Sequence, residues 1–267
     1  MSRAQPNDAG PGPAEGAPIL ELHGVSQAFG GVVAVSDVTA AFPTGQITGL
    51  IGPNGAGKST LLNLVAGTLR CRTGRILFAG ERVERWPAHA RARKGLARTF
   101  QLSSEFKRLT VIENLVCGTR LGRGETLRGA VLGSWWWGGD ERRAIERATG
   151  ILEQFGLTAK GDQLAGTLSG GERRLVEVGR ALMGSPKLLL LDEPLAGVHP
   201  RNVGRIIDAV KGLKASGISV LACLHEPDAV ERLCDGVVVM SQGVVIATGA
   251  FDAVRKESDV LAAYLGA

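Results

Sequence analysis

The residues best suited to do chemistry form a glycine-rich loop at positions 52–59. In order they are Gly52, Pro53, Asn54, Gly55, Ala56, Gly57, Lys58 and Ser59, a match to the pattern G-x-x-x-x-G-K-[ST]. Between a strand and a helix, such a loop aims unpaired backbone N–H groups at a phosphate chain. We expect Lys58 to reach the β- and γ-phosphates and the Ser59 hydroxyl to bind Mg²⁺. Thr60 completes the predicted nucleotide-binding set.

A second group of polar residues follows an apolar run. Residues 188–191 are four leucines, and Asp192 and Glu193 come directly after them. Successive side chains of a strand point to opposite sides, so the two carboxylates are aimed differently. We expect Asp192 to face the metal and Glu193 to face an attacking water as its general base.

A third motif lies upstream of these carboxylates, where residues 168–172 read Leu-Ser-Gly-Gly-Glu. Together with the phosphate loop and the strand ending in Asp-Glu, it resembles the ATP-binding subunits of ABC transporters over residues 19–266. In that family two subunits pair head to tail, and the L-S-G-G of one closes over the ATP of the other. The resemblance implies that Ser169, Gly170 and Gly171 face the γ-phosphate on a second subunit, which the free N–H groups of a helix start would favour.

Three more residues take roles from the family. Phe29 matches the aromatic side chain that stacks on adenine. Gln101 matches the glutamine that contacts Mg²⁺ and water and begins the loop facing the membrane partner. His225 matches the switch histidine that bonds the γ-phosphate. The resemblance therefore implies that the catalytic residues are Glu193, His225 and Gln101, and that the metal is held by Ser59, Gln101 and Asp192.

The sequence departs from the family pattern in two places. The loop after the catalytic glutamate usually reads S-A-L-D, whereas residues 196–199 read Ala-Gly-Val-His. The carboxylate that crosses the dimer in many relatives is therefore absent, and the role of His199 stays open. Glu172 stands where Gln is common, and we expect this change to matter little.

Finer details favour one type of transporter. Gly30 and Gly31, residues 95–101 and residues 263–266 resemble most the importer subunits for branched-chain amino acids. Lipopolysaccharide-export ATPases share much of this, but the insertion at 118–143 favours the importer. Urea and amide importers would look much the same. The rival from another class is an ABC ATPase that acts on nucleic acid or ribosomes.

Two local features leave alternatives open. The three tryptophans at 135–137 cannot share one helix face, so they pack on the helical lobe or contact the membrane subunit or lipid headgroups. Residues 70–98 hold nine basic residues against two acidic ones, a local charge of +7 compared with +5 for the whole chain. A solvated helix face explains this segment most simply, and an anionic partner is the alternative.

Composition restricts the class of protein further. The chain has 267 residues, of which 44% are hydrophobic and 21% charged, values typical of a globular protein. Its apolar runs are far shorter than the roughly 18 residues that span a bilayer. Four widely spaced cysteines indicate neither a zinc site nor a disulfide framework, which fits a reducing cytosol, and we expect them to be small buried residues.

The pattern along the chain predicts the elements that position these residues. Hairpins are expected at 19–42 around Gly30 and Gly31, at 75–83 and at 237–247, and a buried strand at 46–51 precedes a helix at 58–66. Residues 110–182 have a helical pattern, with Ile145, Ala148, Ile151, Leu152 and Phe155 on one face. Apolar runs at 188–191 and 218–224 flank a helix at 202–214, which indicates parallel βαβ units. A last helix is expected at 252–264.

We therefore predict an α/β fold, a P-loop NTPase (ABC ATPase) core with an antiparallel β subdomain and an inserted helical subdomain. Residues 1–18 form a disordered tail, 19–100 and 184–267 the nucleotide-binding core, and 101–183 the helical subdomain. The resemblance implies an ATPase that uses ATP and Mg²⁺, pairs with a second ATPase subunit, identical or different, and drives membrane permease subunits. A periplasmic substrate-binding protein takes part indirectly, and no nucleic acid is expected. The ATPase subunit itself would be a peripheral protein on the cytoplasmic face of the inner membrane.

Overall fold

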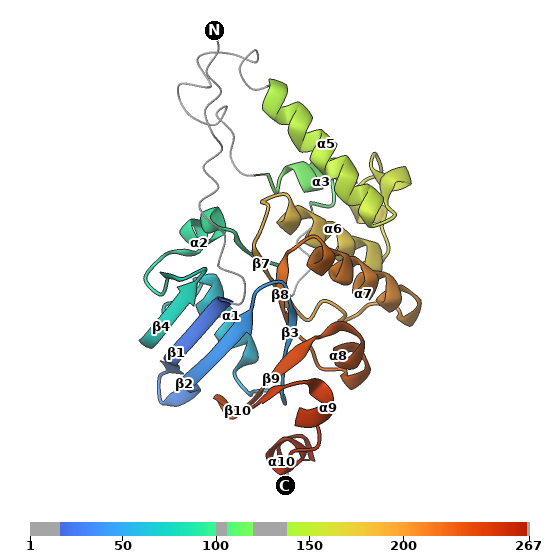
Figure 1. Cartoon of the computed structure of the whole chain (residues 1–267). Helices are drawn as coiled ribbons and strands as arrows, with labels where there is room; N and C mark the ends of the chain where they lie inside the picture. Colours follow the sequence, from blue (N-terminus) through green and yellow to red (C-terminus); the bar gives the residue numbers. More distant parts are fainter. Residues whose placement is uncertain (1–16, 100–105, 120–137, 266–267) are drawn as a thin grey trace.

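The computed structural model describes residues 17–99, 106–119 and 138–265, without the side chains of 138, 264 and 265. Two sheets organise these residues (Figure 1). One sheet has four strands in the order β2-β1-β4-β5, and the other has six in the order β10-β9-β3-β8-β7-β6. Gln101 and the tryptophans at 135–137 lie outside the described residues, as do most of the predicted tail and most of the insertion at 118–143.

The four-stranded sheet is antiparallel, as predicted. Its strands are β1 (Pro18–Phe29), β2 (Val32–Pro43), β4 (Thr73–Phe78) and β5 (Glu81–Arg82). Phe29 pairs with Val32 across the expected Gly30-Gly31 turn, which confirms the first hairpin. The second predicted hairpin is β4 and β5, joined at Ala79 and Gly80.

The six-stranded sheet is the central layer. Its strands are β3 (Ile47–Ile51), β6 (Leu96–Arg98), β7 (Leu188–Asp192), β8 (Ser219–Cys223), β9 (Gly236–Ser241) and β10 (Val244–Gly249). Neighbours from β6 to β9 pair in parallel, and only β10 runs antiparallel, to β9. Every residue of β3, β7 and β8 is buried, which is why their sequences read as continuous apolar runs.

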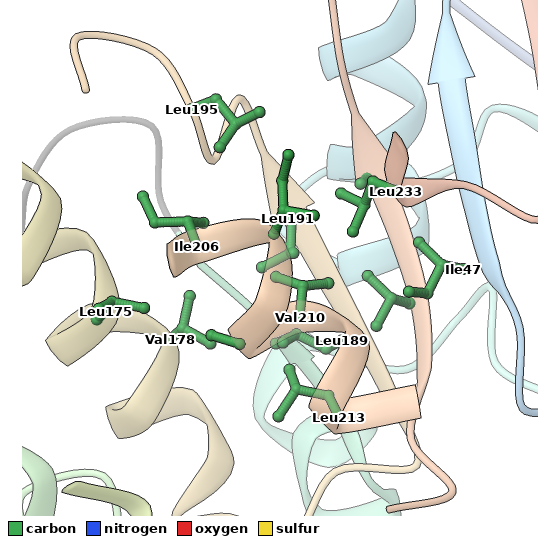
Figure 2. Close-up of a cluster of buried hydrophobic side chains, with 14 of the residues drawn as sticks. Ile47, Leu175, Val178, Leu189, Leu191, Leu195, Ile206, Val210, Leu213 and Leu233 are labelled. Atoms are coloured by element: carbon green, nitrogen blue, oxygen red, sulfur yellow. The ribbon is translucent and has the colours of Figure 1, made fainter. Parts of the chain in front are cut away.

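Alternate residues of β7 enter two separate cores. Leu188 and Leu190 pack in the cluster that holds α1 (Lys58–Ala66) and the antiparallel sheet. Leu189 and Leu191 pack in the cluster that holds α6 (Gly170–Leu182) and α7 (Pro200–Ala215), as Figure 2 shows. Each fully buried leucine contributes about 1.5–3 kcal/mol through the hydrophobic effect. The central sheet is thus fixed from both faces, with α1 on one and α6 on the other.

The helical region also contains α3 (Val111–Val116) and α5 (Gly138–Gln154). Two short 3₁₀ turns, η3 (Thr158–Lys160) and η4 (Ala165–Thr167), connect α5 to α6. Of the five residues predicted to share one face of α5, Ile145 is 43% exposed. Ala144 is buried in its place, four residues before Ala148 on the helix face that also holds Ile151.

The C-terminal part holds α8 (Pro227–Leu233), α9 (Phe251–Val254) and α10 (Ser258–Leu265). The single helix predicted at 252–264 is therefore wrong. Lys256 N–H donates to Ala253 O and Glu257 N–H to Val254 O, so the helix tightens into turns three residues apart and ends. Among the described residues, no helix is long and apolar enough to span a bilayer.

The basic segment at 70–98 is only partly a solvated surface. It contains α2 (Ala88–Lys94), whose Arg91 is fully buried. The Arg91 guanidinium donates to the carbonyls of Leu64 and Val65 in the last turn of α1, at 2.6 and 2.7 Å, and to those of Trp86 and Glu84. Burial lowers the pKa of Arg91 to about 10. This arginine therefore caps the helix that follows the glycine-rich loop.

The expectation of four buried cysteines holds only for Cys223. Cys71 and Cys234 are half-buried, and Cys117 is exposed after the end of α3.

Candidate functional site

The glycine-rich loop connects β3 to α1, as the sequence predicted. Gly52 has φ of 145° and Gly57 has φ of 97°, and side chains at these positions have no room. A Cβ on Gly52 would lie 2.0 Å from Met240 O, and one on Gly57 would lie 2.3 Å from Ala34 O. Gly57 is the N-cap of α1 and offers no side-chain cap, so the first N–H groups of the helix are left to an anion.

Lys58 is folded against the loop that precedes it. Its ammonium donates to Gly52 O at 2.7 Å and to Pro53 O at 2.8 Å, and only 6% of the residue is exposed. Burial lowers the pKa of Lys58, an effect opposed by the nearby Cys223, Glu193 and Asp192. An ammonium has three N–H donors, so the two carbonyls leave one for a phosphate oxygen. Thr60 and Asn54 lie on this loop and its helix, and Ser59 is exposed.

Asp192 occupies the end of β7 beside Cys223 of β8 and is 2% exposed. Its Oδ2 accepts a hydrogen bond from Arg98 Nη2 at 2.9 Å. Its Oδ1 is buried and has no hydrogen-bond partner among the residues that the structure describes. A buried carboxylate oxygen in this condition is unfavourable unless a ligand completes it. With the Ser59 hydroxyl at the start of α1, this oxygen offers the hard donors that Mg²⁺ prefers, so the residues fit that ion.

Arg98 was counted only as part of the basic segment, and its place in the site was missed. Its Nη1 donates to Asn63 Oδ1 of α1 at 2.6 Å, while its Nη2 holds Asp192. The side chain is 11% exposed. One guanidinium therefore joins the helix after the glycine-rich loop to the carboxylate at the end of β7. The available signal was a charged residue in a short apolar stretch next to a predicted sheet.

Glu193 and His225 meet at the carboxyl ends of β7 and β8. His225 Nε2 lies 2.8 Å from Glu193 Oε1, and the side chains are 35% and 23% exposed. A cavity of about 120 Å³ lies beside them, lined also by Leu195 and Ala196. Because one water takes about 30 Å³, this cavity can hold water next to the carboxylate.

The Leu-Ser-Gly-Gly-Glu motif opens α6. Ser169 is the N-cap, and its hydroxyl accepts from Glu172 N–H at 3.4 Å while Glu172 Oε2 accepts from Ser169 N–H at 3.0 Å. Gly171 is required for packing, since a Cβ there would lie 2.8 Å from Asn202 Cβ of α7. Helix α6 packs in the cluster on one face of the central sheet, whereas α1 packs in the cluster on the other face.

Glu172 does more than the sequence reasoning expected. Its Oε1 accepts from Lys160 Nζ at 2.7 Å, and its Oε2 caps α6. Burial acts to raise the pKa of Glu172, but the hydrogen bonds from Lys160 and Ser169 outweigh it and the pKa is lowered. The negative charge is therefore part of how the motif is held.

The remaining predicted positions are also placed. Phe29 ends β1 and is 50% exposed, so its ring is open to a ligand. His199 is the N-cap of α7, where its Nδ1 accepts from Arg201 N–H at 3.3 Å. The histidine thus caps α7 at the position where the family pattern has a carboxylate. Gln101 falls outside the described residues.

Comparison with known proteins identifies the family of this chain. The family model described as ABC transporter matches residues 35–196. A probable branched-chain amino acid transport ATP-binding protein, LivG of Archaeoglobus fulgidus, is 38% identical and covers 93% of this chain and 96% of its own length. The high-affinity branched-chain amino acid transport ATP-binding protein BraF of Pseudomonas aeruginosa is 36% identical, covering 93% and 98%.

Two further comparisons are informative. The lipopolysaccharide export system ATP-binding protein LptB of Haemophilus influenzae is 36% identical and covers 93% of this chain and 97% of its own length. A crystal structure of an ATP-binding cassette of an ABC transporter, in its ADP conformation, has a TM-score of 0.82 and 36% identity, covering 94% of this chain and 99% of that one.

Proposed function

This chain belongs to the ABC transporter ATP-binding family, and we propose that it hydrolyses ATP to energise the import of branched-chain amino acids through separate permease subunits. It is an ATPase with the P-loop fold of that family. The Glu193–His225 pair, next to Asp192 on β7, is the observation that carries the proposed chemistry. Similarity to the LivG and BraF proteins over nearly the whole chain supports the choice of substrate.

The proposed reaction is in-line attack of water on the γ-phosphate. Glu193 orients and deprotonates the water from the edge of the small cavity. Lys58 adds its third N–H donor to the phosphate chain and offsets the negative charge that develops there. His225 and Gln101 position the phosphate and the water. When bound, Mg²⁺ neutralises part of the phosphate charge, held by Ser59, Asp192 and Gln101.

We propose that the complete site is shared by two subunits. The loop residues Gly52 to Thr60 and Glu193 come from one subunit, and Ser169, Gly170 and Gly171 come from the other. The separation of α1 and α6 across the central sheet supports this, because a single chain holds the two motifs on different faces. Phe29, exposed at the end of β1, would stack on the adenine.

A groove supports the proposed permease contact. It has a volume of about 820 Å³ and is lined by residues of α2, β6 and α6, among them His89, Leu96 and Ala181. Strand β6 leads directly into the segment that holds Gln101, which the family resemblance places toward the membrane partner. We propose that a permease subunit docks here, with the protein peripheral at the cytoplasmic face of the inner membrane and a periplasmic binding protein upstream.

We also propose the domain division expected from the sequence, with residues 19–100 and 184–267 as the nucleotide-binding core and 101–183 as the helical subdomain. In the described part, the helices of 101–183 pack among themselves through α3, α5 and α6, which supports this division. Residues 1–18 are proposed as a tail preceding the core.

One alternative rests on a specific observation. The LptB protein is as similar as BraF, at 36% identity, so lipopolysaccharide export competes with amino-acid import. An ATPase acting on nucleic acid is disfavoured, because Arg91 is buried and Arg98 is 11% exposed, which interrupts the basic segment as a surface. Urea and amide import remains a variant of the same proposal.

Reconstitution tests the substrate. The subunit is reconstituted in vesicles with candidate permease subunits, a candidate binding protein and ATP, and uptake of leucine, urea and short amides is compared. We expect leucine uptake that requires ATP and is lost in the Glu193→Gln variant. ATP hydrolysis that responds to lipopolysaccharide and not to leucine would support the export alternative.

A further inference from the structure

Helix α6 carries a buried arginine that the sequence motifs do not explain. Arg174 lies five residues after Ser169 and is 5% exposed. Its Nη1 pairs with Glu177 Oε2 at 2.8 Å, one turn along the same helix, and Glu177 is 4% exposed. Placing this pair in a core is costly, because both charges lose their hydration. An apolar pair would fill the same space, so a structural role alone does not account for it.

The other end of the guanidinium reaches the candidate catalytic centre. Arg174 Nη2 donates to the backbone carbonyl of Glu193 at 3.2 Å. That carbonyl also accepts from Ala196 N–H at 3.1 Å, while Glu193 N–H donates to Cys223 O at 3.2 Å. Among these contacts, Arg174 supplies the charged side chain that donates to the main chain of Glu193.

Glu193 needs such support because its backbone is strained. Its φ is 48°, in the left-handed region that residues with a Cβ rarely adopt. Such a conformation persists only where neighbouring groups hold it. The direction of the Glu193 side chain, and so its contact with His225, depends on this backbone. A lost hydrogen bond to the carbonyl would let Glu193 relax and move its carboxylate.

We propose that Arg174 is a positioning residue that holds the Glu193 carboxylate at the attacking water by fixing the glutamate backbone. The inference rests on the proposed ATPase function of the same site. Helix α6 then supports two parts of the proposed site. Ser169 is its N-cap, and about one and a half turns later Arg174 donates to the backbone carbonyl of Glu193.

The test compares variants of the full-length subunit. Arg174→Met alone leaves the Glu177 carboxylate buried without this partner and threatens folding, so the double variant Arg174→Met/Glu177→Met removes both charges together. Arg174→Lys keeps a donor that can reach one of the two acceptors. Arg147→Met is the matched control, because it removes an arginine bond to Leu182 O, in the last turn of α6 and away from Glu193.

We expect the double variant to lose about tenfold in kcat, the worth of one hydrogen bond made by a charged group. Its KM and its affinity for a fluorescent ATP analogue should change less than twofold. Its melting curve should show that it is folded. Arg174→Lys should recover part of the loss, and Arg147→Met should keep the wild-type kcat. A loss that falls on ATP affinity, or an unchanged kcat in the double variant, would overturn the proposal.

A double-mutant cycle with Glu193→Gln separates this inference from the proposed function. If Arg174 acts through Glu193, removing the Arg174–Glu177 ion pair in the Glu193→Gln background should lower the single-turnover rate by less than twofold. An equal tenfold loss in both backgrounds would overturn the positioning role while leaving the ATPase proposal intact. If Glu193→Gln itself leaves turnover unchanged, the catalytic role of Glu193 fails and the inference fails with it, whereas ATP hydrolysis by this chain stands.

Discussion

His225 Nε2 lies 2.8 Å from Glu193 Oε1, so the two residues assigned to phosphate and water are bonded to each other. The contact joins one ring nitrogen of His225 to one of the two oxygens of the Glu193 carboxyl group. In the role proposed for His225, the same Nε2 atom would serve the γ-phosphate, so the two contacts compete for it. Under the proposed function, we expect bound ATP to replace this contact and to leave Oε1 to the attacking water.

Replacing Glu193 by Gln should separate binding from chemistry. Loss of the base should lower turnover by roughly 10²–10⁴, the usual worth of a positioned base. The amide keeps the size and one acceptor, so ATP affinity should stay near the wild-type value and a stable ATP-bound dimer should accumulate. Phosphate release, nucleotide affinity and light scattering measure the three quantities. Turnover near wild type would remove Glu193 from its proposed role.

Lys58→Ala should act on ATP binding itself. The ammonium sits on Gly52 O and Pro53 O with one donor left for phosphate, and its loss removes a charge-assisted contact present in the ground state. ATP affinity should weaken roughly 10- to 100-fold. Titration with a fluorescent nucleotide measures this, with Lys211→Ala on the exposed side of α7 as the control. An unchanged affinity would contradict the assignment.

Arg91→Met should destabilise the fold through α1. The guanidinium donates to four carbonyls, and a methionine would remove all four hydrogen bonds at a buried helix end, where Leu64 O would keep only its bond from Gly67 N–H. We expect a loss of about 2–4 kcal/mol in the free energy of unfolding. Urea denaturation provides the value, and Arg93→Met, an exposed neighbour, should change it by less than about 0.5 kcal/mol. Equal effects in the two variants would argue against this role.

Glu172 makes the stability of the folded Leu-Ser-Gly-Gly-Glu motif depend on pH. Its pKa is lowered in the folded state from the ordinary value of 4.5, despite burial, by the bonds to Lys160 and Ser169. A lowered pKa gives stability that is present above the unfolded-state value and is lost as the pH falls through the folded-state value. The difference in melting temperature between wild type and Glu172→Gln should therefore be largest at pH 6–7 and shrink below about pH 4.5. A difference that stays constant from neutral to acid pH would exclude this effect.

Much of the fold followed from local patterns. The four leucines before Asp192 predicted a strand buried on both faces, because a parallel strand in the middle of the sheet has no solvent side. The glycine-rich loop required a strand before it and a helix after it, and β3 and α1 supply both. Both patterns consist of residues that are neighbours along the chain, so they can be recognised from the sequence alone.

The missing parts depend on contacts between distant residues. Arg98 meets Asp192 across 94 positions, and Arg91 meets Leu64 across 27. The only local signal was the short apolar stretch around Arg98, and Arg91 had none, so both were counted with the basic segment. The face of α5 was misjudged for a related reason, since Ala144 and Ile145 differ in hydrophobicity in the wrong direction for their burial. The helix predicted at 252–264 failed because two turns end α9 in a stretch without Gly or Pro.

The shared site gives the most direct test. Lys58 and Glu193 would come from one chain and Ser169 from another, so a monomer holds only some of the residues that a complete site needs. A Ser169→Arg chain and a Lys58→Ala chain, each nearly inactive, should recover part of the activity when mixed, provided that one intact site suffices.

The decisive measurement is phosphate release per mole of wild-type subunit over a range of protein concentrations, with light scattering recorded on the same samples. Specific activity should rise in the dilute range, where the rate follows the fraction of dimer, and level off once the dimer saturates. A specific activity that stays flat while scattering shows monomer giving way to dimer would contradict the composite site.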